Sequence, residues 1–112
     1  MAARKALSLD WDAQDFRLVR PGVLGATVAT DQLTVTLYRY EPGSSWETHQ
    51  HPEDQVTIVV GGGPITFTCG GEEVVLSLGE TAVIPGGIPH AARLGAEGAR
   101  TVNVFPPRGN RP

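Results

Sequence analysis

The chain has 112 residues, the length of one compact domain. A net charge of -3 with no basic cluster argues against a nucleic-acid partner, and no run approaches the ~20 apolar residues of a membrane span. Cys69 is the only cysteine, which excludes an internal disulfide, and residues 1–10 contain no apolar run of signal-peptide length. We therefore expect a cytoplasmic protein that acts on a small molecule, with no nucleic-acid or membrane partner.

Fourteen glycines and nine prolines punctuate the sequence at short intervals, which predicts short strands joined by tight turns. We expect residues 1–15 to form a polar N-terminal arm, residues 16–105 one domain and residues 106–112 an extended tail. The predicted strands cover residues 16–20, 23–30, 33–40, a segment carrying His49 and His51, and residues 55–60, 65–69, 73–78, 81–84 and 99–105. Short strands without a helix between them predict an all-β antiparallel sandwich or barrel.

Residues 33–40 alternate between apolar and polar positions with a period of two. Side chains at every second position of a strand leave the same face of the sheet. Leu33, Val35 and Leu37 are therefore expected to share one face.

The three histidines of the chain lie in two segments bracketed by glycine and proline. His49 and His51 are one residue apart, so on a strand both imidazoles can point at one spot. Gln55 opens the next strand, and His90 follows a turn at residues 85–89. Three imidazoles and one oxygen donor suit a transition metal and leave coordination positions open for water or substrate. The alternative is three ordinary histidines with hydrogen-bond partners, but their concentration in two segments favours a metal site.

The spacing of these segments resembles the two sequence motifs of the cupins. The first motif is matched by Gly43, His49, His51, Gln55 and Gly62. The second motif is matched by Gly79, Pro85, Gly86, Gly87 and His90, and residues 63–78 separate the two. The resemblance extends from about residue 33 to residue 105. It implies a small antiparallel cupin barrel, of the jelly-roll or double-stranded β-helix type, that holds one divalent metal inside and forms a homodimer.

The resemblance implies that His49, His51 and His90 are the imidazole ligands of this metal, which we expect to be nickel, zinc, iron or manganese. The motif's glutamate falls on Gln55, whose carbonyl oxygen can bind a metal but cannot act as a carboxylate base. A neutral ligand set leaves a divalent ion its full charge, which favours an anionic or enolisable substrate. Asp54 is the alternative fourth ligand if the preceding loop shifts the register by one residue.

Within the cupins, the chain resembles the subgroup of the small pectin-degradation protein through the run HQHPEDQV and the ending VFPPR. That subgroup opens unsaturated uronate rings to linear ketonised sugars, and its metal ligands are three histidines and a glutamine, which agrees with Gln55. The further functional residues of the subgroup fall on Asn103, Phe105 and Arg108 of this chain. Asn103 stands where the subgroup has an aspartate, and the segment between Phe105 and Arg108 is one residue shorter than in the subgroup. Asn103 cannot exchange a proton as a carboxylate would. Arg108 could clamp a substrate carboxylate or could lie solvated at the surface.

The leading interpretation is a metal-dependent enzyme for a small oxygenated substrate, with uronate-type ring opening or isomerisation first. A polyketide cyclase or a dioxygenase of the cupin type follows. The rival from another class is a non-catalytic ligand-binding or sensing cupin, which Asn103 favours.

Aromatic residues near the first motif have two interpretations. Tyr38, Tyr40 and Trp46 could stack on a sugar or aromatic ligand, or pack in the core or at an interface. Trp11 is expected to cover a sheet edge or a partner subunit. Cys69 alternates with threonines and is expected to be a packed small hydrophobic residue, not a nucleophile.

Overall fold

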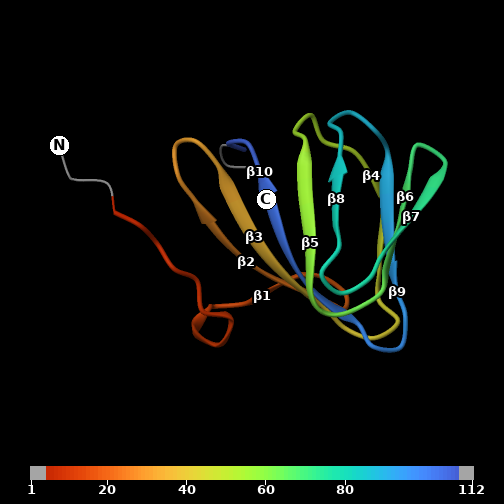
Figure 1. The fold of residues 1–112 in the computed structure, drawn as a ribbon, viewed down its shortest axis with the longest axis horizontal. Helices are drawn as coiled ribbons and strands as arrows, with labels where there is room; N and C mark the ends of the chain where they lie inside the picture. Colours follow the sequence, from red (N-terminus) through yellow and green to blue (C-terminus); the bar gives the residue numbers. More distant parts are fainter. Residues whose placement is uncertain (1–4, 109–112) are drawn as a thin grey trace.

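The structure of the chain is a computed structural model that describes residues 5–108. Residues 1–4 of the expected arm and residues 109–112 of the expected tail lie outside the described part. The described residues form a short 3-10 helix, η1, and ten strands (Figure 1). Their bounds are η1 Trp11–Ala13, β1 Arg17–Arg20, β2 Val23–Ala29, β3 Thr34–Tyr40, β4 Ser45–His49, β5 Gln55–Gly62, β6 Ile65–Cys69, β7 Glu72–Leu76, β8 Thr81–Ile84, β9 His90–Leu94 and β10 Ala99–Phe105.

The strands form two antiparallel sheets that stand face to face (Figure 1). The larger sheet has the order β1-β2-β3-β10-β5-β8, and the smaller one has the order β4-β9-β6-β7. The last strand, β10, therefore lies between β3 and β5, and β4 pairs with β9, which carries the second motif's histidine. The predicted all-β antiparallel fold is confirmed. Within residues 5–108, no helix has the length and apolar character needed to cross a membrane.

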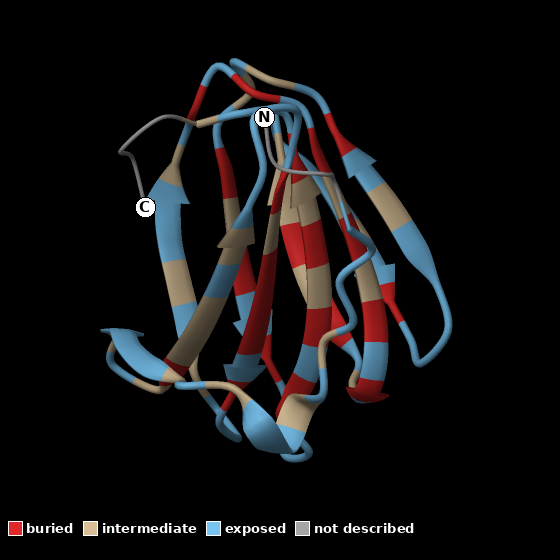
Figure 2. Ribbon diagram, turned by 90° about the vertical axis from the view of Figure 1, so that its left-hand side faces the viewer, coloured by how far each residue is buried: buried red, intermediate tan, exposed pale blue. Residues whose placement is uncertain are grey.

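Burial alternates along the strands, as Figure 2 shows. In β5, Gln55, Thr57 and Val59 are buried while the residues between them are less so, which is the period-two pattern of a strand with one inward face. The largest fully buried aliphatic side chains are Val23, Val59, Ile65 and Ile84. Each such side chain contributes about 1.5–3 kcal/mol through burial. The core therefore draws on strands of both sheets.

Strand β3 turns a polar and aromatic face inward. Thr36 and Tyr38 line a cavity between the sheets, while Val35 and Leu37 alternate onto the other face, which they share as predicted. Leu33 precedes the strand and is 41% exposed. The apolar face that the sequence pattern emphasises is thus not the face that borders the cavity.

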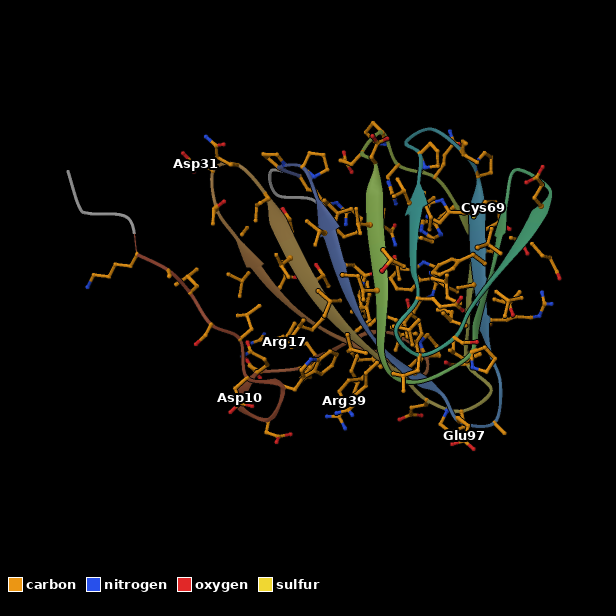
Figure 3. All side chains as sticks on the ribbon, in the orientation of Figure 1. Asp10, Arg17, Asp31, Arg39, Cys69 and Glu97 are labelled. Carbon is orange, nitrogen blue, oxygen red and sulfur yellow. The ribbon has the colours of Figure 1, made fainter. Side chains whose placement is uncertain are left out.

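The segment before β1 contacts the larger sheet through aromatic and guanidinium groups. Trp11 stacks on Phe16 with 5.4 Å between ring centroids, and the Arg100 guanidinium of β10 lies 5.7 Å from the Trp11 ring. Arg39 of β3 lies 5.3 Å from the Phe16 ring, and Figure 3 shows Arg39 and Arg17 near the same end of this sheet. Trp11 therefore covers the larger sheet.

Two features of the histidine segments differ from the sequence expectation. Strand β4 ends at His49, so His51 lies in the following loop and the argument from a shared strand face is wrong for this pair. Pro52 has no N–H for a strand ladder, which disfavours continuation of β4 through this segment. The second difference is β9, a strand beginning at His90 that the sequence did not predict.

The loop after β4 and the loop after β8 are bonded to each other through the backbone of the second motif. The Gly86 N–H donates to Oδ1 of Asp54 at 2.8 Å, and the Gly87 N–H donates to the carbonyl oxygen of His51 at 2.8 Å. A Cβ atom on Gly86 would overlap the Pro52 carbonyl group. Glycine at position 86 therefore allows the two loops to approach closely.

Gly86→Ala is expected to lower the free energy of unfolding by about 3 kcal/mol, because the added Cβ meets backbone atoms that cannot move aside cheaply. Gly87→Ala is the matched control. Position 87 has open space but a φ of +79°, so we expect a loss of about 1 kcal/mol from backbone strain alone. Urea unfolding measures both losses. Equal losses would contradict a special role for the close approach at Gly86.

Candidate metal centre

The three histidines meet although they come from three different places in the chain. His49 ends β4, His51 follows in the loop, and His90 begins β9 directly opposite His49 in the strand register. The ring centroid of His90 lies 4.3 Å from that of His49 and 4.9 Å from that of His51. One nitrogen of each ring lies within 4.8 Å of the others, so the group could hold a metal ion.

Backbone carbonyl groups set the tautomer of each histidine. Each Nδ1 lies 2.9 Å from a carbonyl oxygen. The acceptors for His49, His51 and His90 are the carbonyl groups of Glu47, Glu53 and Ile88, in that order. Because a carbonyl oxygen only accepts, Nδ1 carries the proton in all three rings and Nε2 carries the lone pair. Metal-binding histidines commonly have their second nitrogen fixed in this way.

The histidine environment fits a metal in two further respects. Nε2 of His90 is buried and has no hydrogen-bond partner in the part of the chain that the structure describes. A buried acceptor left unsatisfied costs about 1–3 kcal/mol, which a bound cation would offset. Burial also lowers the pKa of His49 and of His90, with the neighbouring histidines adding to the effect in both. Both imidazoles therefore keep their lone pairs at neutral pH.

Gln55 brings an oxygen to the same place. It opens β5, is 7% exposed, and its Oε1 lies 3.1 Å from Nε2 of His51. Both atoms are acceptors when Nδ1 of His51 carries the proton, so a cation bound by both would relieve their repulsion. Asp54 is exposed and its carboxylate accepts from Gly86 instead. The structure places Gln55, and not Asp54, beside the histidines, and its role as a ligand stays a prediction.

A cavity of about 600 Å³ opens between the two sheets next to the histidines. Besides the three histidines and Gln55, its wall includes Arg20, Thr36, Tyr38, Tyr40, Trp46, Phe105 and Arg108. Among the described residues, no aspartate or glutamate lines it. Burial raises the pKa of Tyr38 and of Tyr40, so both phenols stay protonated at neutral pH. The cavity therefore presents cationic and neutral groups to a ligand.

Arg108 is held inside the structure and is not solvated. Its side chain is 10% exposed, its Nε lies 3.4 Å from Oε1 of Glu53, and its guanidinium lies 4.2 Å from the Phe105 ring centroid. The Phe105 ring in turn contacts His51 edge-on at 5.7 Å. The sequence interpretation missed Glu53, which is 8% exposed, because nothing in its local pattern marks a buried acid.

Asn103 and Cys69 lie away from the cavity wall. Asn103 is in the middle of β10, is 1% exposed, and is not among the residues that line the cavity. Its amide contacts Gln55 and Thr57 behind the histidines.

Cys69 ends β6 in the smaller sheet and packs against the apolar core (Figure 3). Burial raises the pKa of its thiol, which agrees with a packed, unreactive cysteine.

The fold and this site define a known class of protein. Residues 36–105 match the family model described as a cupin domain, and the chain belongs to the cupin family. Among solved structures, KdgF from Halomonas sp. is 27% identical with a TM-score of 0.84, over 95% of this chain and 97% of that chain. This likeness confirms the resemblance to the pectin-degradation subgroup.

Two more distant structures share the fold alone. A RmlC-like cupin from Shewanella frigidimarina is 19% identical with a TM-score of 0.82, over 96% of this chain and 95% of that chain. The polyketide cyclase RemF from Streptomyces resistomycificus is 19% identical with a TM-score of 0.80, over 91% and 80% of the two chains. No curated protein matches the sequence.

Arg108→Met is expected to lower the free energy of unfolding by about 3 kcal/mol, because it leaves the buried Glu53 carboxylate without its guanidinium partner. Adding Glu53→Gln is expected to restore part of the loss, since a neutral amide is easier to bury. The matched control is Arg93→Met. Arg93 and Glu73 approach more closely, at 2.8 Å, but are 59% and 56% exposed, so we expect a loss of only about 0.5 kcal/mol. Urea unfolding distinguishes the two, and equal losses would contradict the importance of burial.

Proposed function

We propose that the protein is a metal-dependent enzyme that opens or isomerises the ring of a small anionic sugar of the uronate type. One observation carries this proposal: three imidazole nitrogens and an amide oxygen converge on a cavity whose wall holds two arginines and, among the described residues, no carboxylate. Such a wall suits an anion. The 27% identity with KdgF over nearly the whole of both chains supports the same substrate class.

His49, His51, His90 and Gln55 would hold one divalent ion, which we infer to be nickel, zinc, iron or manganese. These donors are the imidazole and carbonyl groups that such ions accept, and none of them is a carboxylate. When bound, the ion supplies Lewis-acid polarisation of a substrate oxygen at full charge.

Arginines would bind and orient the substrate carboxylate. Arg108 lines the cavity while its ion pair with Glu53 limits its motion, so its planar guanidinium is preorganised for a carboxylate. Arg20 lines the same cavity, and its guanidinium lies over the Trp46 ring at 5.1 Å from the ring centroid, a cation–π contact that orients it. These contacts favour a ring that carries one acidic group.

Tyr38 is the group that could deliver a proton to the substrate. Ring opening breaks the bond between the anomeric carbon and the ring oxygen as the anomeric hydroxyl loses its proton, and ketonisation adds one proton to a carbon of the substrate. The net change therefore needs a group near the ring that gives one proton and takes one back. Burial raises the pKa of Tyr38, against the opposing effect of Arg108 beside it, and its Oη therefore holds a proton at neutral pH. With no acid on the described wall, Tyr38 takes the place that a carboxylic acid would otherwise have.

A second candidate function is ligand binding without turnover. The observation that favours it is Asn103, a group that cannot exchange a proton, at the position where the pectin-degradation subgroup has an aspartate. In this case the same cavity would bind an anionic sugar and release it unchanged.

Protein purified without a metal-affinity tag is expected to contain about one transition-metal ion per chain by elemental analysis, because the four donors form one site. His90→Ala is expected to lose most of this metal. Gln50→Ala is the matched control, since Gln50 lines the same cavity between the two first-motif histidines but belongs to no donor set. A wild-type chain that gains no metal from nickel, zinc, iron or manganese solutions would contradict the site.

Metal-loaded protein is expected to remove the absorbance of an unsaturated uronate as its conjugated double bond is lost. The methyl ester of the same uronate is the matched control, because it lacks the charge that Arg108 and Arg20 would bind. Loss of a charged hydrogen bond of about 1.5–3 kcal/mol predicts a kcat/KM lower by about tenfold to 100-fold for the ester. A flat trace with metal-loaded protein, together with tight uronate binding, would favour the binding function over the enzyme.

A further inference from the structure

Asn103 lies in a row of buried polar side chains that crosses three neighbouring strands of the larger sheet. It is the register partner of Thr36 in β3 and of Thr57 in β5. Asn103 and Thr57 are 1% and 0% exposed. Because Asn103 does not line the cavity, any effect it has on a ligand there must pass through another side chain.

The hydrogen bonds of Asn103 allow its amide one orientation. One end lies 3.2 Å from the carbonyl oxygen of Thr36, which can only accept, so this end is the amino group. The same nitrogen donates to Oγ1 of Thr101 at 2.9 Å. Oδ1 of Asn103 therefore points to β5, where the Thr57 hydroxyl donates to it at 2.8 Å and Nε2 of Gln55 lies 3.4 Å away.

Thr57 passes this orientation on to Gln55. Since the hydroxyl proton of Thr57 is used on Asn103, its oxygen has only lone pairs to offer, and it accepts from Nε2 of Gln55 at 2.8 Å. The amino end of Gln55 is thus held against Thr57 and Asn103. Its Oε1 faces Nε2 of His51 at 3.1 Å. Turned the other way, the amide would direct N–H groups at the histidines and offer no metal donor.

We propose that Asn103 is a positioning residue that acts through Thr57 to make Gln55 present its oxygen, and not its amino group, to the three histidines. The inference rests on the proposed metal site. An aspartate at position 103 would keep part of this role, because a carboxylate oxygen also accepts from Thr57 and Gln55. It would have no N–H for the Thr36 carbonyl, so asparagine satisfies both ends of the row.

The test measures cobalt(II) affinity of the full chain by competition with a chelator, together with the d–d absorption spectrum of the cobalt-loaded protein. Asn103→Leu removes the acceptor and keeps the branching of the side chain, and we expect about tenfold to 100-fold weaker binding and an altered spectrum. Asn103→Asp keeps the acceptor, and we expect affinity within about threefold of wild type but a lower thermal midpoint from the lost donor. Affinity and stability would then change independently, which a purely structural role would not produce.

Two further variants assign the effect to Gln55. In a Gln55→Ala background, Asn103→Leu is expected to cause no additional loss of affinity, because the group that it positions is absent. Thr57→Val keeps the side-chain shape and removes the connecting hydroxyl. We expect it to weaken binding less than Asn103→Leu does, since Asn103 still lies 3.4 Å from Nε2 of Gln55. This variant carries the test if Asn103→Leu does not fold.

Wild-type cobalt affinity in a folded Asn103→Leu protein, or an equal loss with and without Gln55, would overturn the positioning role and leave the metal site intact. If Asn103→Leu does not fold, wild-type cobalt affinity in Thr57→Val would overturn the positioning role and leave the metal site intact. A wild-type chain that binds no cobalt would overturn the metal site itself.

Discussion

The geometry of the candidate site depends on the backbone contact between the loop after β4 and the loop after β8. The Gly86 N–H bonds to the Asp54 carboxylate and the Gly87 N–H bonds to the His51 carbonyl, so the backbone of one loop is tied to the other loop although the two are far apart in sequence. Pairing of β4 with β9 has already closed the long loop that separates them, so these bonds add little further entropic cost. With the backbone held there, the bond from Nδ1 of His90 to its own turn sets the direction of the ring.

The first motif contains three acids, yet none reaches the histidine nitrogens that would bind a metal. Glu47 is exposed with Arg20 3.7 Å away, Glu53 is buried against Arg108, and Asp54 accepts from the second-motif loop. The donors beside the cavity are therefore neutral although the whole chain has a net charge of -3. A cation there would keep most of its field for a ligand, because no carboxylate on the described wall neutralises it.

Local pattern was enough for most of the strands, though not for β9, and for the inward direction of Gln55, because β5 is regular and its alternation continues from Gln55 to Gly61. The direction of the His51 side chain could not be predicted in this way, since His51 lies in the irregular loop after β4. The hydrogen-bond and ion-pair partners of the buried amide and guanidinium groups could not be predicted from the sequence either. Gln55 and Asn103 are 48 residues apart, and they meet only because β10 lies between β3 and β5. Strand order of this kind leaves no periodic trace in the sequence.

The division of the cavity between elements has an evolutionary consequence. The candidate donors come from β4, β5, β9 and the adjoining loop, whereas Arg20, Tyr38 and Tyr40 come from β1 and β3, two strands that carry no donor. Substitutions in β1 and β3 can reshape the space around a ligand without replacing a donor. Selection can therefore change substrate range and metal chemistry separately, and a lineage can acquire a new specificity while its reactive centre stays in use.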